Sequence, residues 1–305
     1  MNNNKIYING FWDGFVDNTD ANNINIMKQI IEYTKIISFD ITTNIDDANI
    51  LLESVFEPTK VFYKNWKYKI HFSGENKYYE FKNYDVVLFS STIQGALLSN
   101  GSNVVDFPLF SYYIHSNRLL DKLINKPYNN IIPKEFCCFI VSNPKCLIRN
   151  KMFDILNSYK KVHSYGKLRN NMNNIIQFKY WSNEFIKFIS NYKFIICFEN
   201  SKFGTYMTEK IVNPYLANIV PIYWSSHHVK KIFNMDSMIF MEDETDESYN
   251  NVIQKIIELD KDDVKYLKKR NKSVFSAEGI NYWNNNYTIE NIGKNTDNLL
   301  YDVFS

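Results

Sequence analysis

The sequence predicts an α/β protein with two doubly wound domains, each built on a parallel sheet, that face a central cleft. Helical and strand patterns alternate along almost all of the 305 residues, as in parallel sheets that are covered by helices on both faces. A polar segment with two prolines, residues 120–134, separates two such runs. We therefore expect domains at residues 1–125 and 126–280, and a tail at 281–305 that packs back on the first domain.

The first run contains short apolar segments and one segment with helical spacing. Residues 25–35 place Ile26, Ile30 and Ile31 on one helical face. Five segments are short and apolar enough to be strands, at residues 5–9, 36–41, 49–55, 68–72 and 84–89.

The second run repeats this alternation. Strands are predicted at residues 136–141, 161–163, 193–198, 219–223 and 238–241. Helices are predicted at residues 148–159, 183–190, 248–259 and 262–270, and from residues 209 and 227 onward. The tail is weakly patterned, apart from a short closing helix expected at 298–304.

Composition and charge exclude several classes of protein. A hydrophobic content of 45% suits a globular chain, and a net charge of +2 gives no sign of a nucleic-acid-binding surface. The first residues lack the basic and apolar regions of a signal peptide, and no apolar run approaches the roughly 20 residues that span a membrane. Four cysteines without metal-site spacing predict buried, reduced thiols: Cys137, Cys138, Cys146 and Cys197.

Residues 192–224 contain the most informative pattern, which predicts a strand, a polar loop, a helix and a second strand. Thr208 can cap a helix that begins at Glu209 and Lys210, and the N-terminus of a helix attracts phosphate. The Lys210 ammonium would meet that phosphate, whereas Glu209 would be repelled unless it faces a hydroxyl. Ordinary helix-terminus chemistry also accounts for a Glu-Lys pair, and Pro214 is expected to kink the helix.

This stretch resembles the donor-binding signature of the α1,3/α1,4-fucosyltransferases of glycosyltransferase family 10, which use GDP-fucose. The similar segments are FENS at 198–201, YMTEK at 206–210 and VPIYW at 220–224. The resemblance implies a GT-B fold. It also implies that Asn200 bonds a phosphate oxygen, that Tyr206 encloses the donor and that Glu209 holds the hydroxyls of the donor.

A second segment, FIVSNP at 139–144, resembles the strand and Ser-Asn turn that precede the phosphate-binding arginine of this family. By this resemblance Ser142, Asn143 and Arg149 bind the donor, and Tyr165 lies at its pocket. Arg149 would equally suit the surface of a helix, and Tyr165 would suit a plain turn.

The catalytic base is expected in the first domain, across the cleft from the donor. HFSGEN at 71–76 resembles the Gly-Glu-Asn turn whose glutamate is the family's proposed base. Glu75 has a reference pKa of about 4.3 and would be ionised at neutral pH, as a base must be. A solvated loop glutamate is the alternative. Phe11 and Trp12 could form an aromatic platform for the acceptor, although core packing explains them as well.

The resemblance as a whole implies an inverting fucosyltransferase. It would move L-fucose from GDP-β-L-fucose to a hydroxyl, expected to be O3 of N-acetylglucosamine, in a glycan acceptor. No metal site is predicted and no cofactor is expected, because Arg149 and Lys210 would neutralise the diphosphate. In having no apparent membrane anchor, the sequence is similar to the bacterial or viral members of the family, which implies a cytoplasmic protein. The alternatives are a GT-B enzyme that uses another nucleotide sugar, and a catalytically silent nucleotide- or glycan-binding protein.

Overall fold

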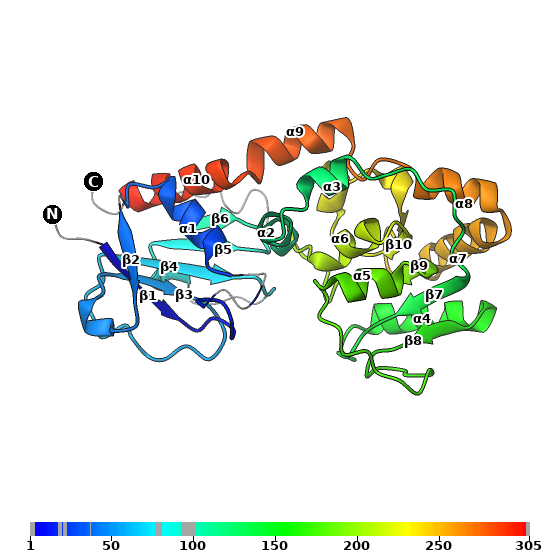
Figure 1. The fold of residues 1–305 in the computed structure, drawn as a ribbon, viewed down its shortest axis with the longest axis horizontal. Helices are drawn as coiled ribbons and strands as arrows, with labels where there is room; N and C mark the ends of the chain where they lie inside the picture. Colours follow the sequence, from blue (N-terminus) through cyan, green and yellow to red (C-terminus); the bar gives the residue numbers. More distant parts are fainter. Residues whose placement is uncertain are drawn as a thin grey trace. The chain divides into compact units, whose positions relative to one another are not determined.

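The chain forms two α/β units in a computed structural model, which describes residues 4–17, 20, 23–36, 38–76, 81–92 and 102–302 (Figure 1). The first unit comprises the chain up to Arg118, residues 203–206, and the chain from Tyr282 onward. The second comprises residues 119–202 and 207–281. The division therefore falls at Arg118 rather than at residue 125, and a short piece of the predicted donor loop belongs to the first unit.

The first unit is built on a parallel sheet of six strands in the order β2-β1-β3-β4-β5-β6. The strands are β1 (Asn4–Asn9), β2 (Phe39–Thr42), β3 (Ile50–Glu53), β4 (Tyr68–Ser73), β5 (Val86–Phe89) and β6 (Val104–Asp106). The helices that belong wholly to this unit are α1 (Asn25–Glu32), α2 (Leu109–Ser116) and α10 (Ile289–Asp302). Short 3₁₀ helices lie at Ile45–Asp47 and Phe81–Asn83.

Alternate residues of these strands share one buried face. Ile6, Leu52 and Ile70 join a single apolar cluster with Ile30 of α1 and Ile292 of α10. Side chains along a strand alternate between its two faces, so this register directs one apolar set toward the helices. Helices α1 and α10, from opposite ends of the chain, pack directly against each other beside this sheet (Figure 1).

The second unit has a parallel sheet of five strands in the order β11-β10-β9-β7-β8. The strands are β7 (Glu135–Phe139), β8 (Val162–Ser164), β9 (Tyr192–Ile196), β10 (Val220–Tyr223) and β11 (Ile239–Phe240). The helices are α3 (Leu120–Ile124), α4 (Leu147–Tyr159), α5 (Asn183–Ile189), α6 (Glu209–Leu216), α7 (Asp246–Lys261) and α8 (Asp263–Arg270). Helix α9 (Ala277–Asn286) spans the boundary of the two units, and 3₁₀ helices lie at His227–Lys231 and Met235–Ser237.

The core of the second unit is separate from that of the first. Phe139, Phe194 and Ile222 of the sheet pack in one cluster with Phe153 of α4 and Ile256 of α7. All four cysteines are buried and none forms a disulfide, as predicted for buried thiols. Among the described residues, no helix is both long and apolar enough to cross a membrane.

The structure differs from the sequence prediction at several places. Strand β6 and helix α2 were not predicted, and residues 120–124 of the expected linker are helical. The tail is almost entirely helical, whereas only residues 298–304 were expected to be; the last two of these lie outside the described residues. The predicted helix from residue 227 is a 3₁₀ helix. Helix α6 continues through Pro214 to Leu216.

Candidate active site

The second sheet reverses its strand order between β7 and β9. Strand β8 lies beside β7, and β10 lies beside β9, so the connections after β7 and β9 leave in opposite directions. Such a reversal opens a crevice at the carboxyl ends of the two strands, which is where doubly wound sheets bind ligands. A cavity of about 240 Å³ lies here. Six of the predicted donor-binding residues line it: Ser142, Asn143, Arg149, Asn200, Glu209 and Lys210.

Arg149 lies in the first turn of α4 and is almost completely buried, with 1% of its surface exposed. One terminal nitrogen, Nη1, donates to the backbone oxygen of Phe198 at 3.2 Å and to Oδ1 of Asn200 at 3.1 Å. The other, Nη2, donates to the backbone oxygen of Asn143 at 3.0 Å. These bonds hold the guanidinium on the cavity wall. They also use both hydrogens of Nη1, so a contact between this nitrogen and phosphate requires them to rearrange.

Lys210 reaches the cavity from the first turn of α6. Thr208 is the N-cap of this helix, as predicted, because its hydroxyl accepts a hydrogen bond from the Lys210 backbone N–H at 3.3 Å. The Lys210 ammonium donates to the same hydroxyl at 3.1 Å. The helix N-terminus and the ammonium therefore place positive potential at the same wall of the cavity.

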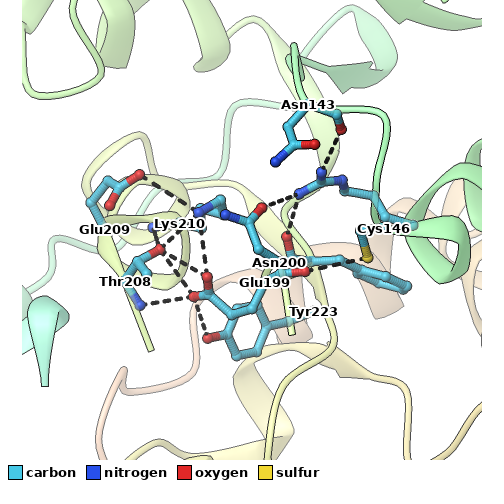
Figure 2. A network of polar contacts seen from close by, with 10 residues as sticks. Asn143, Cys146, Glu199, Asn200, Thr208, Glu209, Lys210 and Tyr223 are labelled. Atoms are coloured by element: carbon cyan, nitrogen blue, oxygen red, sulfur yellow. Dashed lines mark hydrogen bonds and ion pairs between the residues drawn. The ribbon is translucent and has the colours of Figure 1, made fainter. Parts of the chain in front are cut away.

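Glu199 lies beneath Lys210 and is fully buried, with 0% of its surface exposed. Figure 2 shows its carboxylate among Thr208, Lys210 and Tyr223. It accepts hydrogen bonds from the Thr208 backbone N–H and the Tyr223 hydroxyl, each at 2.8 Å, and forms an ion pair with Lys210 at 3.4 Å. No role was predicted for this residue beyond its place in the FENS segment.

Two further residues at the cavity were not predicted. Tyr180 precedes α5, and its backbone oxygen accepts a hydrogen bond from Asn213 of α6 at 2.9 Å; both residues line the cavity. Burial and the negative charge of Glu209 raise the pKa of Tyr180. Asn213 lies four residues after Glu209 on the same helix, and this spacing was the available signal for it. No local signal marks Tyr180, because its loop reaches the cavity only through the fold.

Two predicted donor-binding residues are absent from the cavity wall. The hydroxyl of Tyr165 lies 3.2 Å from that of Tyr192, and its ring packs edge-on against Phe188. Tyr206 is buried and belongs to residues 203–206, the short piece that lies with the first unit.

That short piece is fastened to the first sheet by a buried carboxylate. Asp106, at the end of β6, accepts hydrogen bonds from the hydroxyls of Thr92 at 2.7 Å, Thr205 at 2.6 Å and Tyr287 at 2.9 Å. The backbone N–H of Thr205 also donates to the backbone oxygen of Thr92 at 3.0 Å. Burial raises the pKa of Asp106.

Glu75 follows β4 at the carboxyl edge of the first sheet and is exposed. Its backbone oxygen accepts a hydrogen bond from the Ser73 hydroxyl at 3.2 Å. Gly74 does not have the left-handed conformation; a Cβ added there would lie 3.0 Å from Cδ1 of Leu109, so close packing is the constraint.

Phe11 and Trp12 follow β1 and are partly buried against the core of the first unit. The Phe11 ring stacks on Phe15 at 4.0 Å, whereas the Trp12 ring meets Phe56 edge-on at 5.6 Å. Phe56 follows β3 and is 47% exposed. Core packing thus accounts for Phe11, while Trp12 and Phe56 form an aromatic pair that reaches solvent.

A metal centre requires several ligands that converge on one point. In the part of the chain that the structure describes, no three His, Cys, Asp or Glu side chains are grouped in this way.

Comparisons with known proteins identify the family. The profile of the glycosyltransferase family 10 (fucosyltransferase) C-terminal region matches residues 133–298, more than half of the chain. The α-(1,3)-fucosyltransferase FucT of Helicobacter pylori is 40% identical over 112 residues, which are 37% of this chain and 22% of that protein. Human 4-galactosyl-N-acetylglucosaminide 3-α-L-fucosyltransferase 9 is 29% identical over 155 residues, which are 49% of this chain and 40% of that protein.

The chain thus spans less than half the length of these two curated relatives. A crystal structure of an α1,3-fucosyltransferase with GDP-fucose has a TM-score of 0.68 to this chain, at 20% identity, over 98% of this chain and 90% of that one. This likeness and the two parallel sheets confirm the predicted GT-B fold class. The chain belongs to glycosyltransferase family 10, the fucosyltransferase family.

Proposed function

We propose that this protein is an inverting fucosyltransferase that moves L-fucose from GDP-β-L-fucose to a glycan hydroxyl. The observation that carries the proposal is the cavity at the strand reversal of the second sheet, where Arg149 and Lys210 both lie on the wall. Two cations beside a helix N-terminus suit a diphosphate. Membership of the fucosyltransferase family and the likeness to a structure with GDP-fucose support this choice of donor.

In this proposal the diphosphate lies between Lys210 and Arg149. Asn200, whose Oδ1 already accepts a hydrogen bond from Arg149, donates its amide N–H to a phosphate oxygen. Glu209, whose Oε1 lies 3.9 Å from the Lys210 ammonium, holds the donor hydroxyls. The two cations stabilise the charge that grows on the β-phosphate as GDP leaves, which is electrostatic catalysis by preorganised groups. With these cations in place, transfer would not require a divalent metal.

The reaction is a single displacement. The Glu75 carboxylate takes the proton of the acceptor hydroxyl, whose oxygen forms a bond to the anomeric carbon of fucose. The bond from that carbon to the β-phosphate oxygen breaks, and its electrons leave with GDP. Attack from the opposite face inverts the β-linkage of the donor to an α-linkage. The exposed position of Glu75 at the carboxyl edge of the first sheet suits a base that must meet a large substrate.

The acceptor would lie on the first unit. Its sheet reverses strand order between β1 and β3, and Trp12 and Phe56 follow these two strands. A sugar ring can stack on an aromatic pair of which one ring, Phe56, is exposed. Glu75 follows β4, the neighbour of β3. The human relative is a 4-galactosyl-N-acetylglucosaminide 3-α-L-fucosyltransferase, which favours O3 of N-acetylglucosamine as the attacking hydroxyl.

The experiment combines purified protein with GDP-fucose and N-acetyllactosamine, and products are identified by mass spectrometry. EDTA tests the metal-free route, and GDP-mannose is the control donor. A fucosylated trisaccharide formed in EDTA is the expected result, with the linkage mapped by NMR. Release of GDP from GDP-fucose without transfer would refute the choice of acceptor and leave the choice of donor standing. Turnover of GDP-mannose in place of GDP-fucose would assign the site to another nucleotide sugar, and failure to bind GDP would overturn the proposal.

A further inference from the structure

Glu199 has a carboxylate side chain that is completely buried. It follows β9, and its backbone N–H donates to the backbone oxygen of Trp224 at 3.0 Å. Removing a carboxylate from water is strongly unfavourable unless hydrogen bonds and a cation compensate. A fully buried carboxylate beneath a lysine of the cavity wall therefore needs an explanation beyond packing.

The contacts of this carboxylate divide between its two oxygens. Oε1 accepts from the Thr208 backbone N–H and the Tyr223 hydroxyl, each at 2.8 Å. Oε2 accepts from the Thr208 hydroxyl at 2.9 Å and faces Nζ of Lys210 at 3.4 Å (Figure 2). Glu199 thus joins β9, β10 and the first turn of α6. The Lys210 ammonium forms an ion pair with this carboxylate.

We propose that Glu199 is a positioning residue that holds Lys210 at the cavity wall, ready for the diphosphate. The inference rests on the proposed function for the identity of the ligand. Glu199 and the Thr208 hydroxyl hold the ammonium from below, at 3.4 and 3.1 Å. Both distances exceed the roughly 2.8 Å of a strong charge-assisted hydrogen bond. The ammonium, which also lies 3.9 Å from Oε1 of Glu209, is therefore not locked to the Glu199 carboxylate, and it can move to a phosphate oxygen when the donor binds.

The conservative variant Glu199→Gln tests the charge and the contact geometry together. Its amide oxygen can keep the two bonds to Oε1, from the Thr208 N–H and the Tyr223 hydroxyl. The amide NH₂ then faces the Lys210 ammonium, so that two donors oppose each other. Lys210 loses its support, and we expect the dissociation constant of GDP to rise about tenfold.

A double-mutant cycle separates this role from a purely structural one. The dissociation constant of GDP is measured by calorimetry for Glu199→Gln, Lys210→Ala and the double variant. If Glu199 acts through Lys210, its substitution has no further cost once Lys210 is gone, and the double variant binds GDP no more weakly than Lys210→Ala. Additive losses would mean that Glu199 acts independently of Lys210, and would overturn the inference.

A second pair of variants keeps the test decisive if Glu199→Gln does not fold. Tyr223→Phe removes one hydrogen bond to Glu199, and Tyr215→Phe is its matched control. Tyr215 is also a buried tyrosine, but its hydroxyl bonds Ser237 at 2.7 Å. We expect Tyr223→Phe to weaken GDP binding about threefold or more, non-additively with Lys210→Ala, and Tyr215→Phe to leave it unchanged. Equal effects of the two substitutions would overturn the inference.

Ligand binding by the wild-type protein distinguishes a failure of this inference from a failure of the proposed function. Wild type that binds GDP but shows additive cycles refutes the role of Glu199 and leaves the donor assignment standing. Wild type that binds inorganic pyrophosphate but not GDP refutes the donor, and the same cycle is then measured with pyrophosphate. Wild type that binds neither probe overturns both.

Discussion

Removal of the Lys210 ammonium tests the donor site most directly. Lys210→Ala deletes a cation whose side chain is 26% exposed at the cavity. Lys202→Ala is the matched control, since that lysine is 25% exposed in the same unit and pairs with Glu244, away from the cavity wall. Both variants lower the net charge by one, so any difference between them reflects position.

The expected magnitude follows from two effects of the substitution. A hydrogen bond from an ammonium to a charged group contributes about 1.5–3 kcal/mol, which is about a 10- to 150-fold change in affinity. The substitution also leaves Glu199 without the ion pair at 3.4 Å, so its negative charge would repel the diphosphate. We therefore expect the upper part of this range for Lys210→Ala and less than a twofold change for Lys202→Ala.

Isothermal titration calorimetry with GDP at low and high salt gives both the loss of GDP affinity and the electrostatic part of that loss. The difference between wild type and Lys210→Ala should shrink as salt increases, because salt screens the charges. A dissociation constant for Lys210→Ala within twofold of wild type would refute the reasoning. So would an equal loss for Lys202→Ala, since this would show that net charge alone sets the affinity.

Three further predictions concern the first unit. Glu75→Gln should lower kcat by about 10²–10⁴-fold and leave GDP affinity unchanged; steady-state kinetics with calorimetry checks this, and comparable activity removes Glu75 as the base. Burial lowers the pKa of His71 from 6.5 to about 4, so the unfolded chain binds the extra proton between these values, and the free energy of unfolding falls as pH drops through this window. His71→Phe should remove about 1.4 kcal/mol of this loss in the free energy of unfolding for each pH unit within the window. Urea unfolding at pH 7 and pH 5 measures this, and a difference between the two pH values that is the same in the variant as in wild type contradicts it. Gly204→Ala should lower the melting temperature, because φ is +50° and the new Cβ would lie 2.2 Å from the Thr92 backbone oxygen; Gly74→Ala, which meets only a leucine side chain, is the control, and equal shifts argue against backbone strain.

Much of the fold could be predicted because helices and strands are local patterns. The spacing of Ile26, Ile30 and Ile31 predicted a helix that is observed as α1, and the short apolar runs before Glu75 and Asn200 are strands. The tail escaped prediction for a compositional reason. Its many asparagines obscure the few apolar residues, Ile292 and Leu300 among them, that bury α10 against the first core.

The candidate site likewise has features that the sequence predicts and features that it does not. The Thr208 cap and the start of α6 at Glu209 could be predicted, because capping depends on neighbouring residues. Tyr165 and Tyr206 were assigned to the donor pocket by resemblance, yet neither lines the cavity. The position of a loop side chain depends on the elements that pack around it, and a linear motif does not contain that information.

By itself the sequence determined the α/β class, the alternation of elements and the helix cap at Thr208, since each follows from periodicity or capping within a few neighbours. Only the tertiary structure decided the strand orders, and with them the reversal that brings the loops after β7 and β9 to one cavity. It also decided that Glu199 is buried beneath Lys210 and that Tyr180 joins the wall. The physical reason is that strand order and burial arise from contacts between residues far apart in the chain.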